Sequence, residues 1–162
     1  MTKGRVLVAM SGGVDSSVAA ALLVEAGYEC VGVHALLYSE ESTGEARRVA
    51  DTLRIPFHIV DLRDDFKRTV IDSFADAYAQ GLTPNPCIVC NKRIKFGAMA
   101  EIAGEFDCSF VATGHYARVL YDEEQERWCL AQGRDHCKDQ SYALYTLSQE
   151  QLARALFPLG DY

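Results

Sequence analysis

The chain has 162 residues and a formal net charge of −7, with 16 basic residues against 23 acidic ones. Hydrophobic residues make up 49% and charged residues 24%, which excludes a disordered or fibrous chain and predicts one globular domain over residues 1–162. The acidic balance by itself argues against a nucleic-acid-binding domain. No apolar run reaches the roughly 18 residues of a membrane span, and the N-terminus lacks the apolar region of a signal peptide. We therefore expect a cytoplasmic protein with no membrane partner.

Short apolar, β-branched runs alternate with helical patterns along the first two thirds of the chain. The runs typical of buried strands are residues 5–9, 30–37, 57–60 and 110–113. The helical patterns between them cover residues 18–26, 42–54, 66–81 and 91–106. The second of these opens on the capping-box spacing of Ser42 and Glu45.

The last third begins with a hairpin pattern. Two strands, at residues 117–121 and 128–131, flank the acidic turn Asp122–Glu126. A second capping box, at Ser148 and Gln151, then opens a short helix.

The alternation of strands and helices predicts an α/β fold, a doubly wound parallel sheet with right-handed crossovers. Ligands of such folds bind at the carboxyl ends of the strands, near a topological switch. The loops 10–17, 35–42 and 113–116 meet that condition.

Residues 11–17, Ser-Gly-Gly-Val-Asp-Ser-Ser, lie between the first predicted strand and the first predicted helix. The glycines let the backbone turn tightly and approach a ligand, and the helix start offers free N–H groups and a positive dipole end that suit phosphate. Asp15 would repel a phosphate directly, so it either caps the helix or helps to hold Mg²⁺. The loop is neither a Walker A nor a dinucleotide motif, and its composition alone fits a plain glycine-rich turn equally well.

Ser-Gly-Gly-x-Asp-Ser after a first strand resembles the PP-loop of the ATP pyrophosphatase family. The resemblance implies a Rossmann-like, adenine nucleotide alpha hydrolase-like domain that binds ATP and Mg²⁺. A substrate oxygen then attacks the α-phosphate and pyrophosphate leaves, with Asp15 as a catalytic residue. The implied ATP-binding residues are Ala9, Met10, Ser11, Gly12, Gly13, Val14, Asp15, Ser16, Ser17, Ala35 and Gly114.

Three further stretches resemble one branch, the tRNA-uridine 2-sulfurtransferases or 2-thiouridylases. They are Thr83–Gly97, Ala112–Tyr116 and Lys138–Tyr142, and with the loop they span nearly the whole chain in the family's order. The resemblance implies that O2 of a tRNA wobble uridine is adenylated and that a persulfide sulfur then displaces AMP. The implied partners are tRNA and a persulfide sulfur donor protein. The implied tRNA contacts are Asn85, Pro86, Cys87, His115, Lys138, Asp139 and Gln140.

Cys90 is the catalytic cysteine that the resemblance implies. It precedes Asn91, the predicted cap of a helix, and Lys92 and Arg93 follow. A helix N-terminus and nearby cations lower the pKa of a thiol and increase its thiolate, the form that attacks a persulfide sulfur. We therefore expect a lowered pKa at Cys90; the alternative is a buried, inert thiol.

Cys87 forms the one closely spaced cysteine pair with Cys90. Such a pair can be a redox pair, half of a zinc site, or part of an Fe–S cluster with a remote ligand. No second Cys-x-x-Cys exists in the sequence, which argues against a four-cysteine zinc site. No metal site is certain, and an Fe–S cluster at Cys87 and Cys90 remains an alternative.

The remaining histidines and cysteines of the predicted strands favour structural roles. His34 and His58 are predicted as core histidines. Cys30, Cys108 and Cys129 are predicted as small buried hydrophobes, and Cys137 is left undecided.

The family's second cysteine carries the persulfide in a Thr/Ser-x-Gly-x-Cys context, which this sequence lacks, as it lacks the family's later tRNA-binding and β-barrel domains. We expect a fragment or a truncated gene product that does not complete thiolation alone. Two alternatives remain: another PP-loop adenylating enzyme, such as an amide-forming synthetase, or a non-catalytic nucleotide- or Fe–S-binding remnant.

Overall fold

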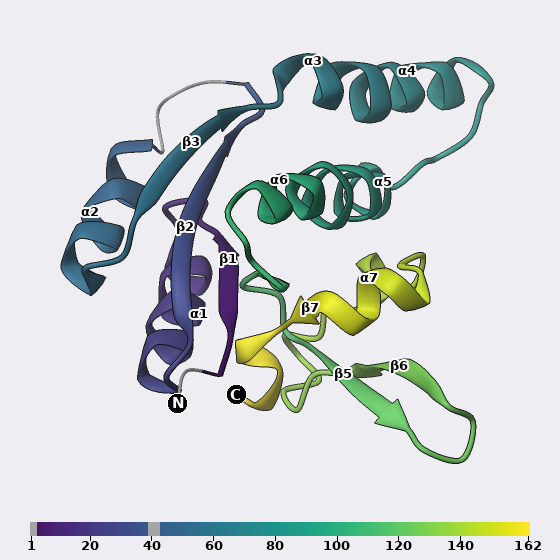
Figure 1. Cartoon of the computed structure of the whole chain (residues 1–162). Helices are drawn as coiled ribbons and strands as arrows, with labels where there is room; N and C mark the ends of the chain where they lie inside the picture. Colours follow the sequence, from purple (N-terminus) through teal and green to yellow (C-terminus); the bar gives the residue numbers. More distant parts are fainter. Residues whose placement is uncertain (1–2, 39–42) are drawn as a thin grey trace.

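The computed structural model of the chain describes residues 3–38 and 43–162. It consists of a parallel sheet with helices on both faces and a separate antiparallel hairpin (Figure 1). The five strands of the sheet lie in the order β3-β2-β1-β4-β7 and all pairs are parallel. They are β1 (Arg5–Ala9), β2 (Glu29–Leu36), β3 (Phe57–Asp61), β4 (Phe110–Ala112) and β7 (Ala155–Leu156). The predicted doubly wound α/β fold is confirmed.

The topological switch lies between β1 and β4. The chain runs outward from β1 through β2 to β3 and then returns across the sheet to place β4 on the other side of β1. Val6 accordingly pairs with Cys30 of β2 on one side and with Phe110 of β4 on the other. The two-residue strand β7 pairs with β4 on the side away from β1. It was not predicted from the sequence.

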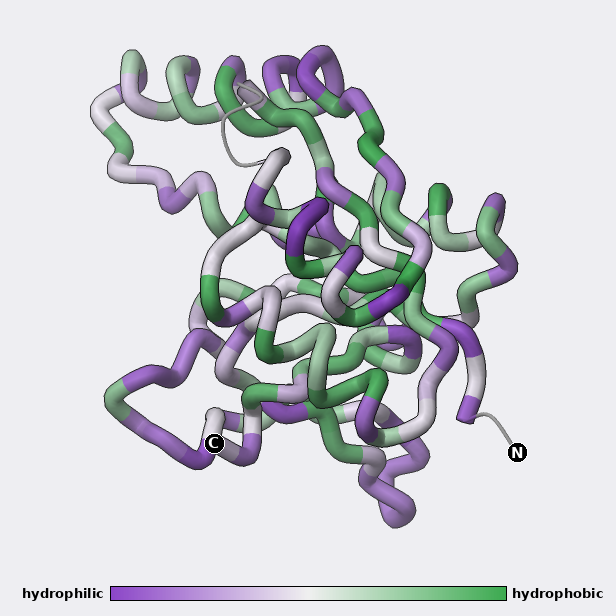
Figure 2. The backbone as a smooth tube through the Cα atoms, turned by 90° about the vertical axis from the view of Figure 1, so that its left-hand side faces the viewer, coloured by the Kyte–Doolittle hydropathy of each residue, from purple (hydrophilic) through white to green (hydrophobic). Residues whose placement is uncertain are grey.

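The alternation of side chains along β1 builds two cores. Val6 and Val8 face helices α1 (Val14–Glu25) and α2 (Thr43–Leu53) and lie in one buried cluster. Leu7 faces the opposite way, into a larger cluster beneath the remaining helices. Figure 2 shows hydrophobic residues gathered in the interior between hydrophilic outer segments.

Two long helices cover the second face, and each contains a π-helical segment. The first runs through α3 (Arg63–Phe66), η1 (Lys67–Ile71) and α4 (Asp72–Ala79). The second runs through α5 (Pro86–Cys90), η2 (Asn91–Ala98) and α6 (Met99–Glu105), beside the first (Figure 1).

The predicted start of the second helix at Asn91 is wrong. Asn85 is the cap: its side chain accepts the N–H of Cys87 at 3.0 Å. Pro86 follows at the first helical position, where its missing N–H costs nothing. Asn91 lies inside the helix, buried, and donates to the carbonyl of Ala143.

Two predictions about burial are also only partly right. In the stripe 66–78, Phe66 is buried, whereas Phe74 and Tyr78 on α4 are 38% and 66% exposed. His34 is a core histidine, but His58 is exposed because β3 is the edge strand.

The C-terminal part agrees with the sequence patterns. The hairpin consists of β5 (Ala117–Asp122) and β6 (Arg127–Gln132). The short helices η3 (Ser141–Ala143), α7 (Gln149–Arg154) and η4 (Pro158–Asp161) follow, and the capping box of Ser148 and Gln151 is present. The predicted cap at Ser42 lies outside the described residues. No helix in the described ranges has the length and apolar character needed to cross a bilayer.

Candidate nucleotide-binding site

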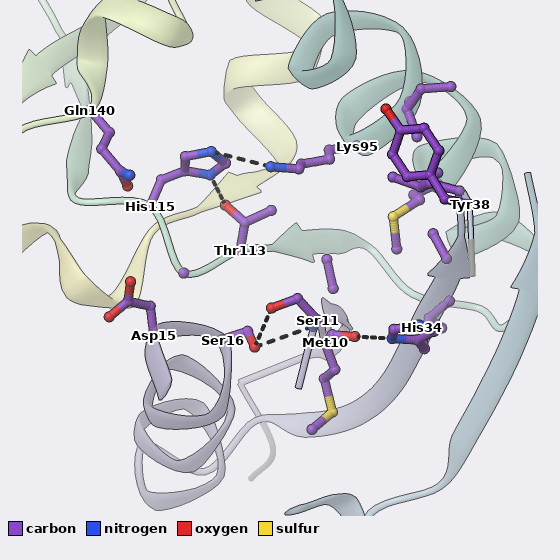
Figure 3. Close-up of a pocket in the computed structure, with 17 residues that line it drawn as sticks. Met10, Ser11, Asp15, Ser16, His34, Tyr38, Lys95, Thr113, His115 and Gln140 are labelled. Carbon is purple, nitrogen blue, oxygen red and sulfur yellow. Dashed lines mark hydrogen bonds between the residues drawn. The ribbon is translucent and has the colours of Figure 1, made fainter. Parts of the chain in front are cut away.

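A cavity of about 420 Å³ opens at the carboxyl ends of β1, β2 and β4 (Figure 3). Its walls are the end of β1 with the start of α1, the end of β2, the segment 113–115 after β4, and one side of η2. The cavity therefore lies at the topological switch, and its size falls in the range of small-molecule sites.

The loop 11–17 is held together by its own serines. The hydroxyl of Ser16 donates to the carbonyl of Gly13 at 3.0 Å and accepts the N–H of Ser11 at 3.2 Å. Ser17 also donates to the Gly13 carbonyl, at 2.8 Å. Gly12 has a φ of +86°, in the left-handed region that favours glycine. The loop is thus formed before any ligand arrives.

Asp15 lines the cavity but does not cap the helix. Gly13 is the N-cap of α1. Its own N–H donates to the hydroxyl of Ser11 at 3.3 Å, and no side-chain hydrogen bond caps the first turn of the helix. The exposed carboxylate of Asp15 accepts a long hydrogen bond, 3.4 Å, from the hydroxyl of Tyr116. Of the two roles predicted for Asp15, helix capping is therefore wrong. The second role, holding Mg²⁺, stays a prediction, and the Asp15 carboxylate lines the cavity where that ion would bind.

Gly114 lets β4 end directly against the start of α1. A Cβ atom on Gly114 would lie 2.7 Å from backbone atoms of both Asp15 and Ser16. No side chain fits at such a distance. This close approach sets one wall of the cavity.

The wall formed by β2 and the second long helix is mostly apolar. Ala35, Leu37, Ile94 and Met99 line it. His34 is buried beside them, and its Nδ1 donates to the carbonyl of Met10 at 2.7 Å. This surface suits the flat face of a base.

Another part of the cavity wall is polar. Lys95 Nζ lies 3.5 Å from Nε2 of His115, whose Nδ1 lies 2.6 Å from the hydroxyl of Thr113 (Figure 3). Burial, reinforced by the nearby Lys95 ammonium, lowers the pKa of His115 from 6.5 to about 3. The imidazole is therefore neutral at physiological pH.

The sequence pattern of the tRNA methyl transferase HUP domain matches residues 4–162. The chain belongs to this family. A tRNA-specific 2-thiouridylase MnmA from Moorella thermoacetica is 56% identical to this HUP domain over 170 residues, which cover 96% of the chain and 48% of the relative. The relative of the same name from Salinibacter ruber is 50% identical, covering 99% of the chain and 46% of its own length. The predicted resemblance to the 2-thiouridylases is confirmed, and the HUP domain spans about half the length of these relatives.

A solved structure shares the fold. A predicted subunit of tRNA methyltransferase from Methanocaldococcus jannaschii aligns with a TM-score of 0.56 and 18% identity, covering 98% of this HUP domain and 69% of that chain. At this identity the likeness concerns the fold alone.

The cavity brings together most of the predicted ATP-binding residues. Those that line it are Ala9, Met10, Ser11, Asp15, Ser16, Ala35 and Gly114. The others shape the loop or the first turn of α1 without lining the cavity; they are Gly12, Gly13, Val14 and Ser17.

The predicted tRNA contacts divide into two groups. His115 and Gln140 line the cavity, and Gln140 accepts the N–H of Tyr116 at 3.1 Å. Outside it lie Asn85, Pro86, Cys87, Lys138 and Asp139.

Asp139 organises its own loop. It accepts the N–H of Gly133 at 2.8 Å and the hydroxyl of Ser141 at 2.8 Å. Burial opposes ionisation, but these hydrogen bonds outweigh it and hold the pKa of Asp139 below its usual value.

Lys95, Thr113 and Tyr38 also line the cavity. Thr113 and Tyr38 belong to the predicted ligand-binding loops 113–116 and 35–42, but the sequence patterns gave none of the three a role of its own. Lys95 appears in the sequence as one cation among several near Cys90, and its proximity to His115 is visible only in the fold.

The predicted lowering of the Cys90 pKa is wrong. Cys90 ends α5 and is half-buried against the larger core cluster, so it does not lie at a free helix N-terminus. Burial raises the pKa of its thiol; the Lys95 charge opposes this and the neighbouring Cys87 adds to it. The sulfur does not line the cavity.

The donor set at Cys87 and Cys90 is too small for a metal cluster. In residues 3–38 and 43–162, no three His, Cys, Asp or Glu side chains gather to hold a metal ion. All six cysteines are free. The described residues thus lack the third ligand that the predicted Fe–S alternative requires, and we do not propose a cluster.

Alkylation should distinguish the two thiols. We expect iodoacetamide at pH 7 to modify Cys87, which is exposed, at least about tenfold faster than Cys90, whose pKa is raised by burial. Peptide mapping by mass spectrometry measures both rates, with Cys87→Ser and Cys90→Ser as matched controls. Faster labelling of Cys90 would contradict the burial seen here.

Proposed function

We propose that residues 1–162 form a PP-loop ATP-binding catalytic domain that activates a tRNA wobble uridine for 2-thiolation. The observation that carries the proposal is the cavity at the switch between β1 and β4, with loop 11–17 on one wall and the helix of Cys90 on another. The curated relatives named tRNA-specific 2-thiouridylase support the same assignment.

The walls of the cavity match the parts of ATP. The phosphates would lie at loop 11–17, where the N–H groups and dipole of α1 favour an anion. The base would lie against Ala35 and its apolar neighbours. Mg²⁺ is typically bound by one or two carboxylates together with phosphate oxygens and waters, and Asp15 supplies a carboxylate on the phosphate side.

The proposed reaction has three steps. Uridine O2 attacks the α-phosphorus of ATP and the bond to pyrophosphate breaks. In the second step a persulfide sulfur, supplied by a donor protein, attacks C2 and AMP leaves, so that C2 is joined to the donor by a disulfide. The Cys90 thiolate then attacks the donor sulfur of this disulfide; the S–S bond breaks, 2-thiouridine is released and a disulfide between Cys90 and the donor forms. Cys90 is the proposed catalytic cysteine, and the charge of Lys95 favours its thiolate against the effect of burial. The tRNA contacts proposed outside the cavity are Asn85, Pro86, Cys87, Lys138 and Asp139.

Replacing Asp15 by alanine should have opposite effects with and without Mg²⁺. With Mg²⁺ we expect ATP affinity to fall at least about tenfold, because the carboxylate no longer holds the ion. With EDTA we expect a gain in affinity, because a negative charge facing the phosphates is removed. Calorimetry with ATP and a non-hydrolysable analogue measures both. Asp76→Ala, at an exposed position of α4, is the control. An unchanged affinity in both buffers would contradict the role.

Isotope exchange between pyrophosphate and ATP tests the substrate class. We expect exchange that depends on tRNA and not on small carboxylic acids. Exchange driven by small acids would instead favour an amide-forming synthetase.

A further inference from the structure

Lys95, His115 and Thr113 form one hydrogen-bonded row on the cavity wall (Figure 3). Lys95 comes from η2, whereas the other two follow β4, so the row connects two separate elements across the cavity wall. His115 in the middle is 9% exposed and Thr113 is 4% exposed. The edge of the His115 ring also contacts the ring of Phe157, with the centroids 6.1 Å apart.

The chemistry of the three groups fixes the direction of the hydrogen bonds. An ammonium group only donates, so His115 Nε2 must accept from Lys95 and carries no proton. The neutral ring then carries its proton on Nδ1, which donates to the Thr113 oxygen. Both ring nitrogens are occupied. The proton of the Thr113 hydroxyl remains available for a further acceptor.

Both ends of the row are therefore donors on the cavity wall. Lys95 makes no ion pair with a carboxylate within the described ranges, and its ammonium retains protons beyond the one given to His115. A charged donor beside a hydroxyl donor in a half-enclosed site matches an anionic oxygen such as that of a phosphate.

We propose that Lys95 and Thr113 donate together to a phosphate oxygen of the bound nucleotide, and that His115 is the positioning residue that orients both. This inference rests on the proposed ATP site and gives His115 a second role beside the tRNA contact that the family resemblance implied. The groups that face its ring are Lys95, Thr113 and Phe157.

The first test is the tautomer of His115 in the ligand-free wild-type protein. Two-dimensional NMR of ¹⁵N-histidine-labelled protein distinguishes a protonated from an unprotonated ring nitrogen, and loss of one ring's signals in His115→Gln assigns the residue among the four histidines. We expect the proton on Nδ1 and a ring that stays neutral from pH 8 to about pH 5, as its lowered pKa requires. A proton on Nε2, or titration near the ordinary histidine pKa, would overturn the proposal.

The second test is ATP affinity measured by calorimetry. We expect Lys95→Met and His115→Leu each to weaken binding at least about tenfold, and Thr113→Val somewhat less. His115→Gln should restore most of the affinity, because its amide offers one acceptor and one donor. Lys67→Met removes a charge at an exposed lysine outside the cavity and should bind like wild type.

ATP binding by the wild type and by Lys95→Met distinguishes a failure of this inference from a failure of the proposed function. If wild type binds ATP and Lys95→Met binds equally well, the row has no role in binding and the inference fails while the ATP site stands. If wild type binds no ATP, the proposed function fails, and the phosphate role of the row fails with it.

Discussion

Gly114→Ala is expected to abolish measurable ATP binding at concentrations that saturate the wild type. The new Cβ would lie 2.7 Å from backbone atoms of Asp15 and Ser16, so either the end of β4 or the first turn of α1 must shift. That shift moves the hydroxyl of Ser16, which ties the loop together. Overpacking of this kind costs about 1–3 kcal/mol of unfolding free energy. Calorimetry and denaturant unfolding measure the two effects.

Gly104→Ala is the matched control for this change. Gly104 lies in α6, and a Cβ there meets nothing within 4 Å. We expect unchanged ATP binding and a gain of about 0.5–1 kcal/mol, because alanine is the better helix former. Equal behaviour of the two variants would show that β4 and α1 do not meet closely at Gly114.

Acid should destabilise the protein through His115. Its pKa is lowered from 6.5 to about 3 by burial and by Lys95, so between these values the unfolded chain binds the proton and the folded chain does not. The stability is therefore complete above pH 6.5 and falls as the pH falls toward 3. The slope from this one group approaches about 1.4 kcal/mol per pH unit within the window.

Urea unfolding between pH 7 and pH 4.5 measures this slope against that of His115→Gln, which cannot titrate. We expect the wild type to lose stability more steeply, and the two slopes to converge above pH 7. Parallel curves throughout would show that His115 ionises in the folded protein as easily as in the unfolded chain.

Local patterns predicted the fold because they agree with the packing along most of the chain. The β-branched run Arg5–Ala9 and the loop after it place one strand end and one helix start with little ambiguity. Asn85 and Pro86 also carried a readable signal, a cap followed by proline at the first helical position, which the pattern at Asn91 obscured.

Other features depend on contacts between distant segments. The pKa of Cys90 is governed by its burial against the larger core, which no local pattern reports. His58 is exposed because β3 is the outermost strand of the sheet within the described part of the chain. Lys95 meets His115 only through the fold, because the two residues come from η2 and from the turn after β4.

Cys90 directly precedes the π-helical segment Asn91–Ala98, and Lys95 lies within it. In an α-helix each residue turns the chain by about 100°, so the number of residues between Cys90 and Lys95 sets the angle between the thiol and the ammonium around the helix axis. Deletion of one residue between Cys90 and Lys95 would remove none of the functional side chains. It would nevertheless rotate Cys90 by about a quarter-turn or more relative to the cavity. We therefore expect this stretch to accept substitutions at exposed Arg93 while its number of residues stays fixed.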